Sequence, residues 1–196
     1  EFSFGQDAAA ELVFINGQYA PQFSNLGRLA KGATVVSLAE AVHDRVDELQ
    51  HYLAHHAEIS KNPFVALNTG FIRDGAYVHL PKGASIRGPI HLLFISLPGS
   101  EPAVSHPRVL IVADENVEAQ IVESYVGEGS GMYFTNSVTE IVAGAESRID
   151  HCRLQQETLE AFHVSSTQLY LGLNANFVSH SATIGGKLTR NDVNVT

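Results

Sequence analysis

The stretch that decides the fold is Ser137–Cys152, SVTEIVAGAESRIDHC, because it recurs as Ser165–His180, SSTQLYLGLNANFVSH. The two stretches are displaced by 28 positions and share their order of polar, apolar and glycine residues. Each contains an extended apolar segment, a turn that begins at glycine, and a second extended segment. A strand-rich repeat without helices is typical of the coils of a β-helix, in which equivalent residues stack about 4.8 Å apart.

The same plan extends toward the N-terminus. The block Leu110–Gln120, LIVADENVEAQ, has the same strand-turn-strand form, with a turn that we expect to be about two residues longer. From about residue 71 onward, segments rich in Val, Ile, Leu, Tyr and Phe alternate with turn clusters. We therefore predict an all-β core that folds as a parallel β-helix over residues 63–196. A sandwich of hairpins is the alternative, but it would not require equal displacements.

The last residues, Asn194-Val195-Thr196, have the composition of a strand interior. We therefore expect the β-helix core to be truncated at its C-terminal end. An unfinished β-helix leaves an open sheet edge that can pair with another chain, so a homodimer through the β-helix is a further expectation.

Residues 1–62 are predicted to form an N-terminal region that begins with a small hairpin. Asn16-Gly17 separates two short extended segments, and this dipeptide tolerates the positive φ that a tight hairpin turn requires.

The hairpin is followed by a helix signal. Ser37 and Glu40 form a capping box, which satisfies two exposed amide groups at a helix start. Apolar residues then recur at helical spacing, which predicts one amphipathic helix over Leu38–Ala57. Pro63 ends this region, because proline disfavours helix at the residue before it.

The composition excludes several classes of partner. The net charge is −9, and no run of Lys or Arg is long enough to follow a phosphate backbone, so we expect no nucleic acid partner. The longest apolar stretch, Pro89–Pro98, is half the length needed to span a membrane. Cys152 is the single cysteine, which excludes an intrachain disulfide and a four-cysteine metal site and fits a reducing, cytoplasmic location.

Several short motifs follow one another from residue 60 onward. They are Asn62–Pro89 (NPFVALNTGFIRDGAYVHLPKGASIRGP), Pro89-Ile90-His91, Ser105–Arg108 (SHPR), Tyr133–Glu140 (YFTNSVTE), Glu160–His163 (EAFH), Ser179-His180-Ser181 and Gly185–Asp192 (GGKLTRND). As an ordered set they resemble the SufB/SufD family of iron-sulfur cluster assembly proteins.

This resemblance implies a right-handed parallel β-helix with helical flanks and no catalytic chemistry of its own. It also implies a complex with a SufB subunit and the ATPase SufC, in which ATP binds only to SufC and iron or an iron-sulfur cluster lies at the subunit interface. A SufD-like member is favoured, because a SufB-like chain is expected to carry more cysteines than Cys152.

The repeat supplies one candidate metal site. Because the displacement is 28 positions, Cys152 and His180 should lie side by side on neighbouring coils, about 5 Å apart. A thiolate and an imidazole suit iron or zinc. A structural ladder of Ser124, Cys152 and His180 is the alternative. His51 and His55 share a predicted helix face, but we expect a solvated face there.

Enzymes remain the alternative function. Asp114, Glu115, Glu118 and Glu123 could supply the paired carboxylates of a β-helical carbohydrate-active enzyme, although acidic residues are also common in turns. A hexapeptide acyltransferase would show a six-residue apolar period, which is not seen. The loop Gly127–Gly131 lacks the Gly-Lys-Ser/Thr ending of a phosphate-binding loop. A purely structural solenoid is the third possibility.

Overall fold

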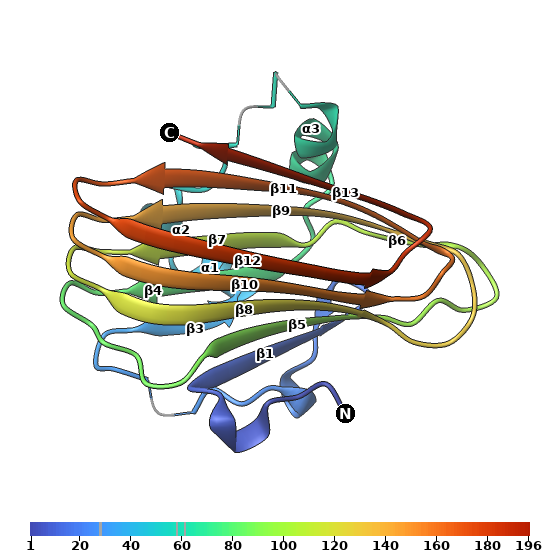
Figure 1. The fold of residues 1–196 in the computed structure, drawn as a ribbon, viewed down its shortest axis with the longest axis horizontal. Coiled ribbons are helices and arrows are strands. Elements are labelled where there is room, and N and C mark those ends of the chain that lie inside the picture. The colour runs from blue at the N-terminus through green and yellow to red at the C-terminus, as the bar shows by residue number, and fades with distance from the viewer. Residues whose placement is uncertain (28, 58, 61) are drawn as a thin grey trace.

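The computed structural model describes residues 1–27, 29–57, 59–60 and 62–196. Two sheets face each other, and the chain passes from one to the other at each turn, so that successive strands stack as rungs (Figure 1). The predicted all-β core in the form of a parallel β-helix is therefore confirmed.

The six-stranded sheet is called sheet A. Its strands, in spatial order, are β12 (Asn176–Gly185), β10 (Arg148–Glu157), β8 (Glu118–Gly127), β5 (Ile90–Ser96), β1 (Ala10–Ile15) and β2 (Gln18–Tyr19). The seven-stranded sheet is called sheet B. Six of its strands, in order, are β13 (Leu188–Val195), β11 (Ala161–Leu171), β9 (Tyr133–Ala143), β7 (Arg108–Ala113), β4 (Gly75–Leu80) and β3 (Thr34–Ser37), and β6 (Ala103–Ser105) pairs with β9.

The N-terminal end of the solenoid is covered by antiparallel strands. β2 pairs with β1, and β3 pairs with β4, whereas the other pairings in both sheets are parallel. The predicted hairpin is confirmed, since Asn16 and Gly17 have φ of 49° and 76° between β1 and β2. Because β1 also pairs with β5, sheet A continues into the N-terminal region. The division between residues 62 and 63 stays a prediction.

The predicted register holds for the last two coils. Ile149 pairs with Phe177, and Cys152 pairs with His180, as the 28-residue displacement requires. One coil earlier the displacement is 30, since Arg148 pairs with Glu118 and Ala143 with Ala113. The turns that follow β7, β9 and β11 have equal lengths, so the longer turn expected in Leu110–Gln120 is wrong. The extra residues lie between β8 and β9.

These equal turns repeat one backbone conformation. Asn116, Glu146 and Asn174 occupy the same position in successive turns, with φ of 58°, 60° and 55°. Asparagine tolerates this left-handed region better than most residues, and Gly83, with φ of 73°, holds it one turn earlier. The Asn174 side-chain amide donates to the Glu146 carboxylate at 2.7 Å, which ties adjacent turns together.

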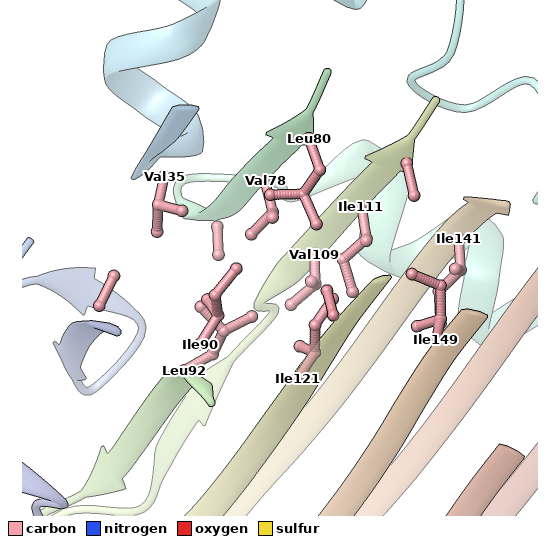
Figure 2. Close-up of a cluster of buried hydrophobic side chains, with 14 of the residues drawn as sticks. Val35, Val78, Leu80, Ile90, Leu92, Val109, Ile111, Ile121, Ile141 and Ile149 are labelled. Carbon is pink, nitrogen blue, oxygen red and sulfur yellow. The ribbon is translucent and has the colours of Figure 1, made fainter. Parts of the chain in front are cut away.

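The main core lies between the two sheets. Inward side chains from both sheets interdigitate, and Figure 2 shows Ile90 and Leu92 of sheet A facing Val78 and Val109 of sheet B. Each such side chain contributes roughly 1.5–3 kcal/mol when it is removed from water. The alternation of inward and outward residues along each strand sets which side chains enter this core.

The helical region differs from the single helix predicted over Leu38–Ala57. The structure has α1 (Leu38–Asp44) and α2 (Val46–Leu49), and turns follow α2. The cap at Ser37 is confirmed, because its hydroxyl accepts from the Glu40 amide. The third helix, α3 (Pro63–Gly70), was not predicted, although Asn62 at its cap and proline at its first position are standard start signals.

A buried carboxylate holds the last part of the predicted helix, from Ala54 to Ala57, in a non-helical path. The amide groups of Ala54, His56 and Ala57 donate to Glu140 of β9 at 2.8, 3.1 and 3.1 Å. A continuous helix would use these amides internally. The same carboxylate pairs with Arg108 of β7, so the turns after α2 are attached to sheet B by charge-assisted hydrogen bonds.

Candidate functional site

The predicted metal-binding pair lies on the outer face of sheet A. Cys152 and His180 are register partners on β10 and β12, and they point away from the core because Ile149 and His151 point into it. Cys152 is half-buried and His180 is exposed. Within the described part of the chain, no group of three or more His, Cys, Asp and Glu side chains is placed to hold a metal ion. The metal role of this pair stays a prediction, and the pair could supply no more than two ligands.

The expected ladder through Ser124 is wrong. With a displacement of 30 between β8 and β10, Cys152 pairs with Val122, and Ser124 pairs with Leu154. The outer row next to the cysteine is therefore Val122, Cys152 and His180.

The inner face of the same strands carries a buried polar network. Glu123 is 1% exposed and accepts hydrogen bonds on both carboxylate oxygens, from His151 at 2.9 Å and from the Tyr125 hydroxyl at 2.7 Å. Thr139 of sheet B donates to the same carboxylate at 3.0 Å. On the other side, His151 pairs with Ser179 of β12, and the Ser179 hydroxyl lies 3.3 Å from the His151 Nδ1. On β8 the register partner of His151 is Ile121, which lies two residues before Glu123. The Glu123 carboxylate nevertheless reaches the His151 ring.

A second buried group centres on His163 of β11. Its Nδ1 lies 2.9 Å from Glu157, and its Nε2 lies 2.8 Å from the Arg153 guanidinium and 3.2 Å from the Ser137 hydroxyl. Because a guanidinium can only donate, Nε2 accepts and the ring proton is on Nδ1, facing the carboxylate. The Arg153 guanidinium also lies 5.0 Å from the centroid of the Tyr125 ring.

A third histidine–glutamate pair holds the N-terminal segment. His91 Nδ1 lies 2.7 Å from Glu11, and its Nε2 lies 2.8 Å from the Ser124 hydroxyl. The Glu11 carboxylate also accepts from the Ser3 hydroxyl at 2.6 Å and the Phe4 amide at 2.8 Å. The Phe4 ring stacks on His91 with a centroid distance of 4.0 Å. Residues 3 and 4 are thereby fixed on the outer face of sheet A.

Burial and hydrogen bonding shift the pKa values of these groups in opposite directions. Burial lowers the pKa of His163 and of His91, and this effect exceeds the opposing contribution of their glutamate partners. Burial raises the pKa of Glu123, but His151, Arg153 and Tyr125 together lower it by more than burial raises it, so the net shift of this pKa is downward. The carboxylate is held ionised and the buried imidazoles are held neutral.

The three histidines each bridge a glutamate and a serine, as in the relay of a serine hydrolase. Their surroundings do not suit that chemistry. Ser124 and Ser137 are 4% and 1% exposed, and Arg153 occupies the nitrogen of His163 that would take the serine proton. The His91 and His163 groups therefore fit a structural role, as hydrogen bonds that satisfy buried polar groups, whereas Ser179 beside His151 is exposed.

The other sequence candidates lie apart from this network. Asp114 contacts His79 at 3.3 Å, and Glu115 pairs with Lys82 in a neighbouring turn, so these carboxylates do not converge as a catalytic pair. His51 and His55 lie in the turns after α2, and the shared helix face predicted for them is wrong.

Sequence reasoning missed the inward polar residues. Arg153 and Glu157 lie at even spacing from Ile149, which the repeat places in the core, so the alternation along β10 already indicated their burial. Their partner His163 comes from the opposite sheet, and no sequence spacing relates the two.

Two family models match the chain. The model described as "SUF system FeS cluster assembly, SufBD core domain" matches residues 95–196, and the model described as "SufBD protein N-terminal region" matches residues 7–92. No helix in the described ranges is both long and apolar enough to cross a bilayer.

Curated relatives agree with these matches. An iron-sulfur cluster assembly SufBD family protein of Synechocystis sp. is 30% identical over 195 residues, which cover 95% of this chain and 43% of the relative. The chloroplastic protein ABCI7 of Arabidopsis thaliana is 30% identical over 138 residues, 67% of this chain and 29% of that protein. A SufBD family protein of Staphylococcus haemolyticus is 24% identical over 163 residues, 81% of this chain and 34% of that protein.

The chain spans less than half the length of these relatives. The core-domain model nevertheless covers more than half of the chain, and it includes the rungs from β7 to β13. The chain therefore belongs to the SufBD family of SUF-type iron-sulfur cluster assembly proteins.

Proposed function

We propose that this chain is part of a SufD-like, non-catalytic subunit of a cytoplasmic SUF complex, in which it pairs with a SufB subunit and the SufC ATPase. The observation that carries this proposal is the match of the SufBD core-domain model to residues 95–196. The single cysteine, Cys152, supports a SufD-like subunit, because a cluster cannot be held by one thiolate from this chain.

The architecture supports a role as a docking subunit. Side chains from both sheets fill the interior, and the His163 group within it is buried, so partners would contact the outer faces and edges of the solenoid. Pairing of a solenoid edge with SufB or with a second copy would be one form of this docking.

Iron or an iron-sulfur cluster is the proposed cargo. Cys152 and His180 would supply two ligands from the outer face of sheet A, and the remaining ligands would come from the partner subunit. ATP would bind to SufC only.

Copurification of the full-length protein with its untagged genomic neighbours, followed by iron and sulfide analysis, tests the proposal. We expect a complex that contains a SufB-like and a SufC-like subunit and carries iron. Recovery of a lone monomer that cleaves a saccharide would overturn the assignment and favour the β-helical enzyme instead.

A further inference from the structure

The interior of the β-helix changes character along its axis. Between β1, β4, β5 and β7 the facing side chains are apolar, and Figure 2 shows those of β4, β5 and β7. From β8 onward many inward positions are polar or charged, although Ile121, Ile141 and Ile149 are apolar. The inward polar residues that are buried are Glu123, Thr135, Ser137, Thr139, His151, Arg153, Gln155, Glu157, His163, Ser165 and Thr167. The two sheets are therefore joined in this part by hydrogen bonds, and each buried polar atom needs a partner.

The His163 group satisfies only part of this requirement. Both ring nitrogens of His163 are used, by Glu157 on one side and by Arg153 and Ser137 on the other. Arg153, which is 5% exposed, donates through Nη1 to Ser165 and through Nη2 to His163. Its Nε has no partner among the described residues.

Two hydroxyl groups flank the same histidine. Thr135 on β9 and Thr189 on β13 are the register partners of His163 on either side, so the three side chains stack along the solenoid axis. Thr135 is 3% exposed, and neither its Oγ1 nor that of Thr189 has a partner in the described part of the chain. The Oγ1 of Thr158, at the turn between β10 and β11, is likewise buried and unpartnered among those residues.

The chemistry of these atoms defines what they can bind. The Nε–H of Arg153 can only donate, whereas the threonine hydroxyls can both donate and accept. A ligand that bonds to both kinds of group must accept a hydrogen bond from the Arg153 Nε–H. It must also donate to, or accept from, the threonine hydroxyls. Water meets both conditions, and buried polar groups in protein interiors are commonly bridged by bound water.

We propose that the β-helix binds a group of ordered water molecules beside His163, held by Thr135, Thr189 and the Nε–H of Arg153. The waters complete the hydrogen bonding between sheets A and B where the apolar core ends. This hydration site is independent of the proposed role in cluster assembly, since it involves inward residues only.

The Thr135→Val variant tests the site, because valine keeps the shape of threonine and removes the hydroxyl. We expect oxygen-17 relaxation dispersion to show the loss of a long-lived water, together with a lower Tm. An unchanged water count with a higher Tm would show that the Thr135 hydroxyl binds no water, and would overturn the proposal. In the control Thr139→Val, whose hydroxyl bonds to Glu123, Tm should fall while the water count is retained.

A crystal structure of the unaltered protein provides a test that does not depend on a variant. We expect electron density for water within hydrogen-bonding distance of Thr135 Oγ1 and Arg153 Nε. An anomalous peak at Arg153 after a bromide soak would show an anion site instead. A rotamer of Thr135 that pairs with a protein group would leave no need for water, and either result would refute the hydration site.

Discussion

Arg108 and Glu140 form an ion pair in which both side chains are completely buried, between sheet B and the segment that follows α2. Arg108 donates through Nε to Glu140 at 3.1 Å, and through Nη1 to Asn68 of α3 at 3.1 Å. Asn68 in turn donates to the carbonyl groups of Pro107 and Asn136. One buried network therefore attaches both the turns after α2 and helix α3 to the β-helix.

We predict that Glu140→Gln destabilises the protein by about 3–5 kcal/mol, because it leaves the buried Arg108 guanidinium without a countercharge. Chemical denaturation measures the change in the free energy of unfolding. As a control, Lys82→Gln removes an ion pair between exposed side chains and should have no measurable effect. Equal stability of the two variants would contradict the role of the buried pair.

Ala54→Gly should stabilise the protein by about 0.5–1 kcal/mol. Ala54 has φ of 63°, a left-handed conformation that glycine adopts without strain, and its amide bonds to Glu140. Ala41→Gly, within α1, should instead destabilise by a similar or larger amount, since glycine is unfavourable in a helix and the site is buried. Thermal unfolding of both variants compares the two backbone effects. A lower Tm for Ala54→Gly than for the unaltered protein would contradict the predicted stabilisation.

Acid should weaken the fold in two steps. The pKa values of His91 and His163 lie below 6.5 in the folded state, so their neutral forms contribute stability above pH 6.5 that is lost as pH falls below it. The lowered pKa values of Glu11 and Glu123 contribute stability above pH 4.5 that is lost at lower pH.

Denaturation curves between about pH 8 and about pH 2 check this order, because the histidine step lies below pH 6.5 and the glutamate step lies below pH 4.5. The exposed-histidine variant His43→Gln should follow the same curve as the unaltered protein. A free energy of unfolding that rises as pH falls from neutral would contradict the directions of these pKa shifts.

Cys152→Ser and His180→Ala should each lower the iron content of the copurified complex, because each removes one proposed ligand. His51→Ala, which alters a histidine away from this face, is the matched control and should retain iron. Unchanged iron in both of the first two variants would remove Cys152 and His180 from the site while leaving membership of the family intact.

The sequence alone determined the solenoid. The recurrence of Ser137–Cys152 at a displacement of 28 positions favoured the stacking of equivalent residues, and the observed pairing of Ile149 with Phe177 confirms it. The Asn16-Gly17 turn was also predictable, because its signal is local and does not depend on distant residues.

Only the tertiary structure decided how the helical region and the buried polar groups are arranged. The helix predicted over Leu38–Ala57 does not reach Ala57, where the Glu140 carboxylate, far along the chain, binds the amides that a helix would use. His163 meets Glu157 and Arg153 because coil stacking brings opposite sheets together. Local patterns report on neighbours along the chain, whereas these contacts depend on how segments distant in the sequence pack together, which no local pattern encodes.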